Sequence, residues 1–365
     1  MSVGAHSGLS AGAELLSGPR GRRLCLELAT AAAPDAWHTL FHLAYAADVE
    51  AGASVTRLVF SRVGDADEMV DEVAEATIER LVAELSTAAV TLSIPAIDDA
   101  FWQSVNAARY WQAPDGVDIV AADPRVLAAL IPLAEVVAAH PASLWWRRPI
   151  VDEQWAIVFE GAPAEFDPAP DAAARWSVST RAEEERARAR LSGAAGRRYS
   201  GNWWSHPWGA PHTTGERPDG IPAGLVYVED SLGWTSAEAV AVAGAGRVVE
   251  IRGADEWAEL CRRYPLDVTA ARGDDWFRTT GRDVRWLLPD WGRVAEDADA
   301  VHLTAWGYLT AATRVIDVDD EYASVIGGWG PDETYWLTGR VREIGRPRVA
   351  WLSTDGPFGP SWVRN

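Results

Sequence analysis

Tryptophan is the residue that most limits how this chain can fold. The sequence has 20 Trp among its 365 residues, and most of them follow residue 150. Each indole buries a large apolar area and carries one N–H that needs a partner, so tryptophan gathers in cores, interfaces and aromatic-lined pockets. The C-terminal half must therefore accommodate many large rings, either in a Trp-rich core or, in part, in the wall of a ligand site.

Length and charge narrow the possible classes of protein. A chain of 365 residues exceeds the size at which a single core usually stops growing, which favours two domains. Hydrophobic residues make up 48% and charged residues 24%, as in folded soluble proteins. The net charge of -20 repels phosphate backbones and argues against general nucleic-acid binding. Every basic residue is arginine, so chemistry that needs a lysine is excluded.

Cysteine usage and hydropathy point to a cytoplasmic protein without a membrane span. Cys25 and Cys261 lie far apart in helix-like contexts, which is typical of buried free thiols in a reducing compartment. The first residues have neither the basic nor the apolar region of a secretion signal. The sequence also has no run of 18 apolar residues that would predict a membrane-spanning helix.

Residues 1–160 are expected to form a mainly helical domain with a minor sheet. Apolar residues recur at helical spacing over four segments, at about 34–45, 65–85, 98–110 and 124–137. The last of these is the best delimited, because Asp123 can cap it, Pro124 suits its first turn and the proline after His140 would end it. Short apolar runs at 58–60 and 155–159 predict strands.

Two features of this half can carry chemistry. Arg20, Arg22 and Arg23 follow Gly-Pro before an apolar helix, where they can hold a phosphate or carboxylate, or form a solvated turn that offsets the acidic chain. His38 and His42 lie four residues apart on one helix face, a spacing that suits a pair of metal ligands. Since no third ligand lies nearby in sequence, a structural role is favoured for this pair.

The segment 161–197 is expected to link two domains. Its first part is rich in Pro, Ala and Asp, which is typical of an exposed linker. Thr180 and Glu183 then form a capping box for a short charged helix, and a helix polar on nearly every face is typical of a solvent bridge. We therefore place the domain boundary in this linker.

Residues 198–365 are expected to form a Trp-rich α+β domain. Strands are predicted at 224–229, 247–251, 300–304, 314–318, 323–326 and 334–337, helices from 235 and at 255–264, and a Trp-rich loop at 274–291. The gaps between these strands are too irregular for a doubly wound parallel sheet. The fold class predicted for the whole chain is α+β.

The segment 198–234 holds the densest set of aromatic and reactive side chains. It contains Trp203, Trp204, His206, Trp208, His212 and Trp234, with several Gly and Pro beside a predicted strand. Chemistry tends to lie on loops that a rigid scaffold holds. His206, His212 and His302 can in principle share a metal, but no metal-binding motif connects them, so no metal site is predicted.

Several landmarks in this region resemble an ADP-ribosyltransferase-like domain of the His-Tyr-Glu type, a group that includes poly(ADP-ribose) polymerases and RNA 2'-phosphotransferases. They are His212-Thr213-Thr214, the predicted strand that carries Tyr227, and the helix predicted to open at Ser236. In that family a His-Gly-Thr on a strand binds the NAD ribose, a tyrosine on a later strand stacks on nicotinamide, and a late glutamate holds a ribose hydroxyl. The resemblance extends to Glu333, and Thr213 stands where the family has glycine.

The resemblance implies NAD as cofactor and a set of site residues. His212, Tyr227 and Glu333 would be catalytic, with Thr213 and Thr214 beside the cofactor, and Glu229 and Glu250 remain alternatives to Glu333. Cleavage of NAD builds positive charge on the ribose, so a carboxylate near the sugar and an aromatic wall for nicotinamide suit the reaction. Trp204 and its neighbours can supply that wall, and Arg198 can bind the diphosphate through its guanidinium.

Two hypotheses for function follow from these residues. The first is an NAD-using ADP-ribosyltransferase or NAD glycohydrolase that binds its small-molecule ligand in the domain formed by 198–365. The second is a non-catalytic binding module, similar to an immunity or adaptor protein, whose exposed Trp contact a protein partner. The first hypothesis requires that His212, Tyr227 and one of the three glutamates meet in one concave pocket.

Overall fold

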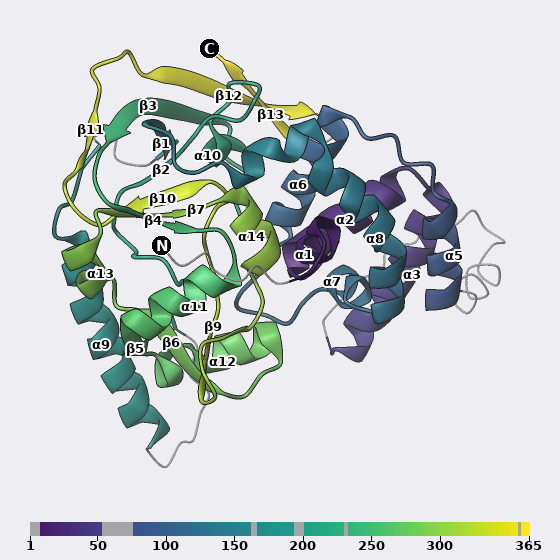
Figure 1. Cartoon of the computed structure of the whole chain (residues 1–365), viewed down its shortest axis with the longest axis horizontal. Helices are drawn as coiled ribbons and strands as arrows, with labels where there is room; N and C mark the ends of the chain where they lie inside the picture. Colours follow the sequence, from purple (N-terminus) through teal and green to yellow (C-terminus); the bar gives the residue numbers. More distant parts are fainter. Residues whose placement is uncertain (1–7, 53–75, 162–165, 193–200, 230–232, 357–358) are drawn as a thin grey trace. The chain divides into compact units, whose positions relative to one another are not determined.

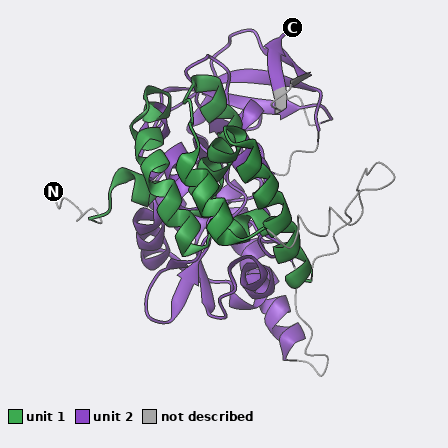
Figure 2. Ribbon diagram, turned by 90° about the vertical axis from the view of Figure 1, so that its right-hand side faces the viewer, with its two compact units in different colours: residues 1–100, 115–144 green, residues 101–114, 145–365 purple. Residues whose placement is uncertain are grey.

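The chain divides into two compact units. The computed structural model describes residues 8–52, 76–161, 166–192, 201–229, 233–356 and 359–365. Unit 1 comprises Met1–Ala100 and Asp115–Leu144, and unit 2 comprises Phe101–Pro114 and Trp145–Asn365 (Figure 2). The fold class is α+β as predicted, with helices in the N-terminal half and mixed sheets in the C-terminal half.

Unit 1 is helical. Its elements are α1 (Ala11–Leu15), α2 (Pro19–Ala31), α3 (Pro34–Glu50), α5 (Ile78–Thr87), the first half of α6 (Ile94–Asn106), α7 (Gly116–Ala121) and α8 (Pro124–Ala139). Helix α8 confirms its prediction in detail, because the side chain of Asp123 accepts a hydrogen bond from the Arg125 N–H and the helix ends before His140. The strand predicted at 58–60 and the first part of the helix predicted at 65–85 lie outside the described residues.

The arginines near residue 20 lie on a helix and not on an open loop. Arg20 is buried within α2 and pairs with Asp118. Arg23 pairs with Glu27, and its Nη1 atom lies 3.0 Å from Asp115 Oδ2. Because the carboxylates of unit 1 already neutralise these guanidinium groups, the structure gives no support to an anion site here.

Unit 2 contains a nine-stranded sheet and a four-stranded sheet. The large sheet has the order β13-β12-β3-β1-β2-β10-β7-β4, with β11 also paired to β3, and among its described strands only β4 and β7 run parallel (Figure 1). Its strands are β1 (Glu153–Phe159), β2 (His212–Thr214), β3 (Ser236–Gly244), β4 (Val248–Ile251), β7 (Ala300–Leu303), β10 (Glu333–Trp336), β11 (Val341–Glu343), β12 (Val349–Gly356) and β13 (Gly359–Arg364). The small sheet contains β5 (Pro265–Asp267), β6 (Arg285–Pro289), β8 (Ile316–Asp317) and β9 (Tyr322–Ser324).

The remaining elements of unit 2 are short helices and one long one. They are η1 (Pro141–Arg147), which begins in unit 1, α9 (Ala172–Leu191), α10 (Ala223–Val226), α11 (Ala254–Arg263), α12 (Thr269–Thr280), α13 (Trp291–Asp297) and α14 (Ala305–Ala311). Helix α9 occupies most of the segment expected to be a linker, and it packs against α12 and α13. It buries Trp176 and Glu184, so this segment belongs to unit 2 and the division between the units falls elsewhere.

Three predicted elements of the C-terminal half are wrong. The segment expected to be a strand at 224–229 begins within the helix α10, the helix expected from 235 is the strand β3, and the loop expected at 274–291 contains the second part of α12 and all of β6. Strand β3 consists largely of Ala and Val and pairs with β1 on one side and with β12 on the other. Two paired edges outweigh the helical preference of alanine, which is a weak local tendency.

The register of the large sheet separates two sets of side chains. Trp155 lies opposite Thr214, Thr214 opposite Glu333, and His212 opposite Tyr335, so these five residues share one face. The other face carries the core cluster of Ala156, Val240, Val242, Ala300, Trp336 and Val341. Alternation along β1, β2 and β10 therefore gives the sheet an apolar core face and a face that bears titratable groups.

No single helix among the described residues is long and apolar enough to cross a membrane. Helix α8 and the following η1 reach the length and apolar composition of a membrane-spanning helix only when they are taken together, and the chain bends by 80° between them.

The close contact between β3 and Trp336 gives a prediction about stability. A Cβ atom on Gly244 would lie 1.7 Å from Cη2 of Trp336, which is itself buried. Gly244→Ala must therefore displace the indole, and we expect it to lower the free energy of unfolding by about 1–3 kcal/mol in chemical denaturation.

Gly273 supplies the matched control for this substitution. It lies inside α12, where an added Cβ would meet nothing closer than 3.7 Å. Gly273→Ala should raise the free energy of unfolding by roughly 0.5–1 kcal/mol, because alanine favours a helix interior. Equal effects of the two substitutions would contradict this packing of Gly244 against Trp336.

Candidate functional site

A cavity of about 510 Å³ lies against the titratable face of the large sheet in unit 2. Its volume falls within the range of small-molecule sites. Strands β1, β2 and β10, helix α10 and two loops contribute its walls, with Trp155, Ile157, Phe159, Glu160, Trp203, Trp204, Trp208, His212, Thr213, Thr214, Gly224, Tyr227, Val228, Glu229, Trp234, Gly328, Trp329, Gly330, Pro331, Glu333 and Tyr335. His212, Tyr227, Glu229 and Glu333 thus line one cavity.

His212 and Glu333 are in direct contact. His212 begins β2 and Glu333 begins the neighbouring β10, and His212 Nδ1 lies 2.5 Å from Glu333 Oε1. The other carboxylate oxygen accepts a hydrogen bond of 2.6 Å from the Gly330 N–H. The side chain of His212 is 54% exposed and that of Glu333 is 10% exposed, so a ligand in the cavity can reach the imidazole.

The two groups hold each other in their charged forms. Desolvation favours the neutral form of each, but the charge and hydrogen bond of Glu333 raise the pKa of His212 above its ordinary value. In Glu333 the His212 imidazole and the Gly330 N–H likewise outweigh desolvation and lower the pKa. Near pH 6 the pair is therefore an imidazolium beside a carboxylate.

Tyr335 joins this pair to a second histidine. Its ring packs against His212, with centroids 5.4 Å apart, and against His206, with centroids 4.7 Å apart. Burial, together with the charges of Glu333 and Glu229, raises the pKa of Tyr335 well above its usual value, so its hydroxyl keeps its proton. Burial also lowers the pKa of His206 to about 3, which makes this imidazole neutral.

Aromatic side chains form most of the cavity wall. Trp204 stacks on Trp208 with ring centroids 4.5 Å apart, and Phe159 stacks on Trp234 with centroids 4.2 Å apart. Trp208 is 60% exposed. The sequence predicted such an aromatic wall from Trp204 and its neighbours.

Buried hydrogen bonds hold the loop that carries these tryptophans. The backbone N–H of Ser205 donates to the carbonyl of Gly327, and the Ser205 carbonyl accepts from the indole N–H of Trp291. The Ser205 hydroxyl accepts a further hydrogen bond from the indole N–H of Trp329. Because Ser205 is fully buried, these contacts fix the loop beside the cavity.

Tyr227 lines the cavity in a different setting from the one expected. It caps the C-terminus of α10, is 2% exposed, and packs against Phe101 with ring centroids 4.4 Å apart. The guanidinium of Arg217 lies 5.3 Å from its ring centroid. Little of this ring is available for stacking on a ligand, whereas Tyr335 packs directly against His212.

Glu229 is the second carboxylate that faces the aromatic wall. Its Oε1 atom accepts hydrogen bonds from the hydroxyl of Tyr110 at 2.6 Å and from the hydroxyl of Tyr308 at 2.8 Å. Two donors on one oxygen fix the orientation of this carboxylate. Glu250, the third glutamate considered from the sequence, is not among the residues that line the cavity.

The other predicted cofactor residues have different surroundings. The Thr213 hydroxyl accepts from the indole N–H of Trp336 and donates to Gln154 on the core face of the sheet, which favours a packing role. The Thr214 hydroxyl accepts a hydrogen bond of 3.0 Å from the Gly224 N–H at the start of α10. Arg198 lies outside the described residues.

His302 is buried in an ionic network on the core face of the sheet. Its Nδ1 atom lies 2.8 Å from Glu250 Oε2, and its Nε2 atom lies 3.4 Å from Asp332 Oδ1. Burial alone would lower the pKa of His302, but the two carboxylates raise it to about 9. Among the residues that the structure describes, no group of three or more His, Cys, Asp or Glu side chains could hold a metal ion.

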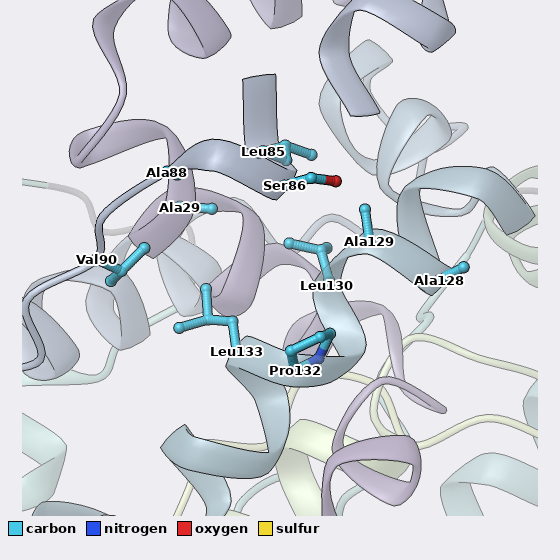
Figure 3. Close-up of a pocket in the computed structure, with 10 residues that line it drawn as sticks. All are labelled: Ala29, Leu85, Ser86, Ala88, Val90, Ala128, Ala129, Leu130, Pro132 and Leu133. Carbon is cyan, nitrogen blue, oxygen red and sulfur yellow. The ribbon is translucent and has the colours of Figure 1, made fainter. Parts of the chain in front are cut away.

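A second cavity, of about 400 Å³, lies in unit 1. Helices α2, α5 and α8 and the segment after α5 line it with small and branched apolar side chains (Figure 3). Ser86 brings a hydroxyl to it, and that hydroxyl donates to the carbonyl of Val82. This cavity therefore offers apolar surface and no acid or base, in contrast to the cavity that His212 and Glu333 line.

The contact between His212 and Glu333 gives a prediction about protonation. In Glu333→Gln the charge that stabilises the imidazolium is lost, so the pKa of His212 should fall below its wild-type value. The pair should stabilise the fold most between about pH 4.5 and 6.5, and less as Glu333 is protonated at lower pH or His212 deprotonated at higher pH. An NMR titration, with the ring signals assigned through His212→Ala, measures the shift.

Glu160 provides the control for this titration. Its carboxylate also lines the cavity, but it accepts hydrogen bonds from Thr235 and Ser236. Glu160→Gln should leave the pKa of His212 close to its wild-type value. The same His212 pKa in wild type and Glu333→Gln would show that the two groups are not paired in solution.

Comparison with known proteins gives no relative for this chain. No family model matches it, and neither the curated proteins nor the solved structures contain a match. The function must therefore be argued from the chemistry of the cavity in unit 2.

Proposed function

We propose that unit 2 binds NAD in this cavity and breaks the bond between its ribose and nicotinamide, as an NAD glycohydrolase or an ADP-ribosyltransferase. The observation that carries the proposal is the meeting of His212, Glu333 and Tyr227 at one cavity, with the first two in direct contact. Convergence of perturbed titratable groups in a concave aromatic site is typical of active sites. The resemblance gives Tyr227 the place beside the ligand, and in this proposal Tyr335, which packs against His212, would occupy that place.

The held carboxylate suits this reaction. When the glycosidic bond breaks, its electron pair passes to the nicotinamide nitrogen, and positive charge develops on the ribose carbon. A water molecule or an acceptor hydroxyl then forms the new C–O bond and releases its proton to solvent. Glu333 would stabilise the cationic sugar, and because His212 and the Gly330 N–H already orient it, little reorganisation accompanies the charge.

The walls of the cavity suit the nicotinamide half of NAD in its oxidised form. The pyridinium ring is cationic, and tryptophan and tyrosine rings attract cations through their faces. Among the described side chains that line the cavity, Glu160, Glu229 and Glu333 are carboxylates and the only cation is His212. With no arginine among the lining residues that the structure describes, the diphosphate would lie outside this cavity.

A protein-binding module is the second candidate. The observation that favours it is the exposure of Trp208 at the rim of the cavity, since exposed tryptophans are frequent anchors of interfaces. This alternative predicts no response to NAD.

The charge of the pyridinium ring allows a sharp test. NADH has nearly the same size but a neutral dihydronicotinamide, so it should stabilise the protein less than NAD does. In thermal unfolding, NAD at about 100 times its dissociation constant should add roughly 2.7 kcal/mol to the free energy of unfolding.

Glu333→Gln should retain NAD binding but release nicotinamide about 100-fold more slowly, because a charge that stabilises the transition state is gone.

One control variant and one result for the wild type separate the outcomes of this test. At saturating NAD, Glu160→Gln should release nicotinamide at nearly the wild-type rate, because Glu160 is hydrogen-bonded to Thr235 and Ser236 whereas Glu333 contacts His212. A wild-type protein that neither gains stability with NAD nor releases nicotinamide would refute the proposed function and favour the protein-binding module.

A further inference from the structure

The residue before Glu333 has an unusual backbone conformation. Asp332 has φ +61°, in the left-handed region that residues other than glycine seldom adopt, and its side chain is almost fully buried. Such a conformation costs on the order of 1–3 kcal/mol and persists where the surroundings impose it. The groups around Asp332 therefore determine the path of the chain into β10.

Three groups from different segments hold the Asp332 carboxylate. The Gly215 N–H donates to Oδ2 at 3.0 Å, and Arg148 Nη2 lies 3.7 Å from the same oxygen. His302 Nε2 lies 3.4 Å from Oδ1. A Cβ atom on Gly215 would lie 2.8 Å from Oδ2, so the close approach of Asp332 requires glycine at that position.

His302 is itself fixed on its other side. Its Nδ1 atom contacts Glu250, and the second oxygen of Glu250 accepts a hydrogen bond of 3.0 Å from the Ile150 N–H. The imidazole is completely buried, so its ring cannot turn without breaking one of these contacts. His302 thus presents a fixed cationic edge to Asp332.

The tethered turn also carries the carboxylate of the proposed site. Glu333 follows Asp332 directly, and its Oε2 atom accepts the Gly330 N–H from the same turn. The distance of 2.5 Å between Glu333 Oε1 and His212 Nδ1 therefore depends on the conformation of residues 330–333. A change of backbone at Asp332 would swing Glu333 away from His212.

We propose that His302 and Asp332 are positioning residues, which hold Glu333 against His212 and in line with the bound sugar. This proposal rests on the proposed function for its catalytic consequence. The carboxylate of Asp332 faces His302 and Arg148, and none of these three residues lines the cavity, so they act on the ligand only through Glu333.

Asp332→Gly tests the tether. Glycine adopts positive φ without strain, so the turn can form, but no side chain links it to Gly215, Arg148 or His302. We expect the NMR pKa of His212 to fall toward its ordinary value because Glu333 is released. The turnover of NAD should drop about 100-fold in kcat with KM changed less than about threefold, as expected for a displaced catalytic group.

Asp332→Asn is the gentler variant and carries the test if the glycine variant does not fold. It keeps an acceptor for the Gly215 N–H and removes the charge that faces His302. The pKa of His212 and the kcat should therefore both fall, but by less than in Asp332→Gly. Asp290→Asn is the matched control, because Asp290 is equally buried and its carboxylate accepts from the Ser177 hydroxyl and pairs with Arg181, both on α9 and not on the turn that carries Glu333. It should lower stability and leave the pKa of His212 unchanged.

The outcomes distinguish this proposal from the proposed function. An unchanged His212 pKa in both Asp332 variants, with lower stability alone, would overturn the positioning role and leave Asp332 as a structural residue. A wild-type protein with no NAD response would refute the proposed function, while the His212 titration would still decide whether Asp332 positions Glu333.

Discussion

The contact between the His212 imidazole and the Glu333 carboxylate is the interaction on which the rest of the site depends. It exists because β2 and β10 are paired in one register, which places both residues on the same face of the large sheet. A shift of that register by one residue would turn Glu333 toward the core face of the sheet and Trp336 out of it. The charged pair therefore connects the topology of the sheet to the chemistry of the cavity.

The tryptophans serve two purposes in this arrangement. Seven of the indoles, those of Trp146, Trp257, Trp276, Trp286, Trp291, Trp329 and Trp336, are almost completely buried, and a second set around Trp204 and Trp208 forms the wall of the cavity. Both uses were open from the sequence, because a large ring suits a core as well as a ligand wall. Ser205 links the two sets, since its backbone and hydroxyl bind buried indoles while its neighbours line the cavity.

Local signals made parts of the fold predictable. Helix α8 carries its own cap at Asp123, and the glutamate chosen by its order in the chain, Glu333, contacts His212. Strand β3 was missed because its alanines favour a helix until β1 and β12 pair with it. Tyr335 and Asp332 were also missed, because their roles arise from register and from contacts with residues far away in the chain. The predicted strand began at Thr334; a start one residue earlier would have placed Glu333 and Tyr335 on one face.

A crystal structure of the protein grown with NAD tests the central claim most directly. We expect the nicotinamide ring among the tryptophans of the cavity and the ribose within hydrogen-bonding distance of His212 and Glu333, with that pair still in contact. An empty cavity at saturating NAD, or NAD bound elsewhere on the chain, would contradict the claim that the His212–Glu333 pair forms an active site.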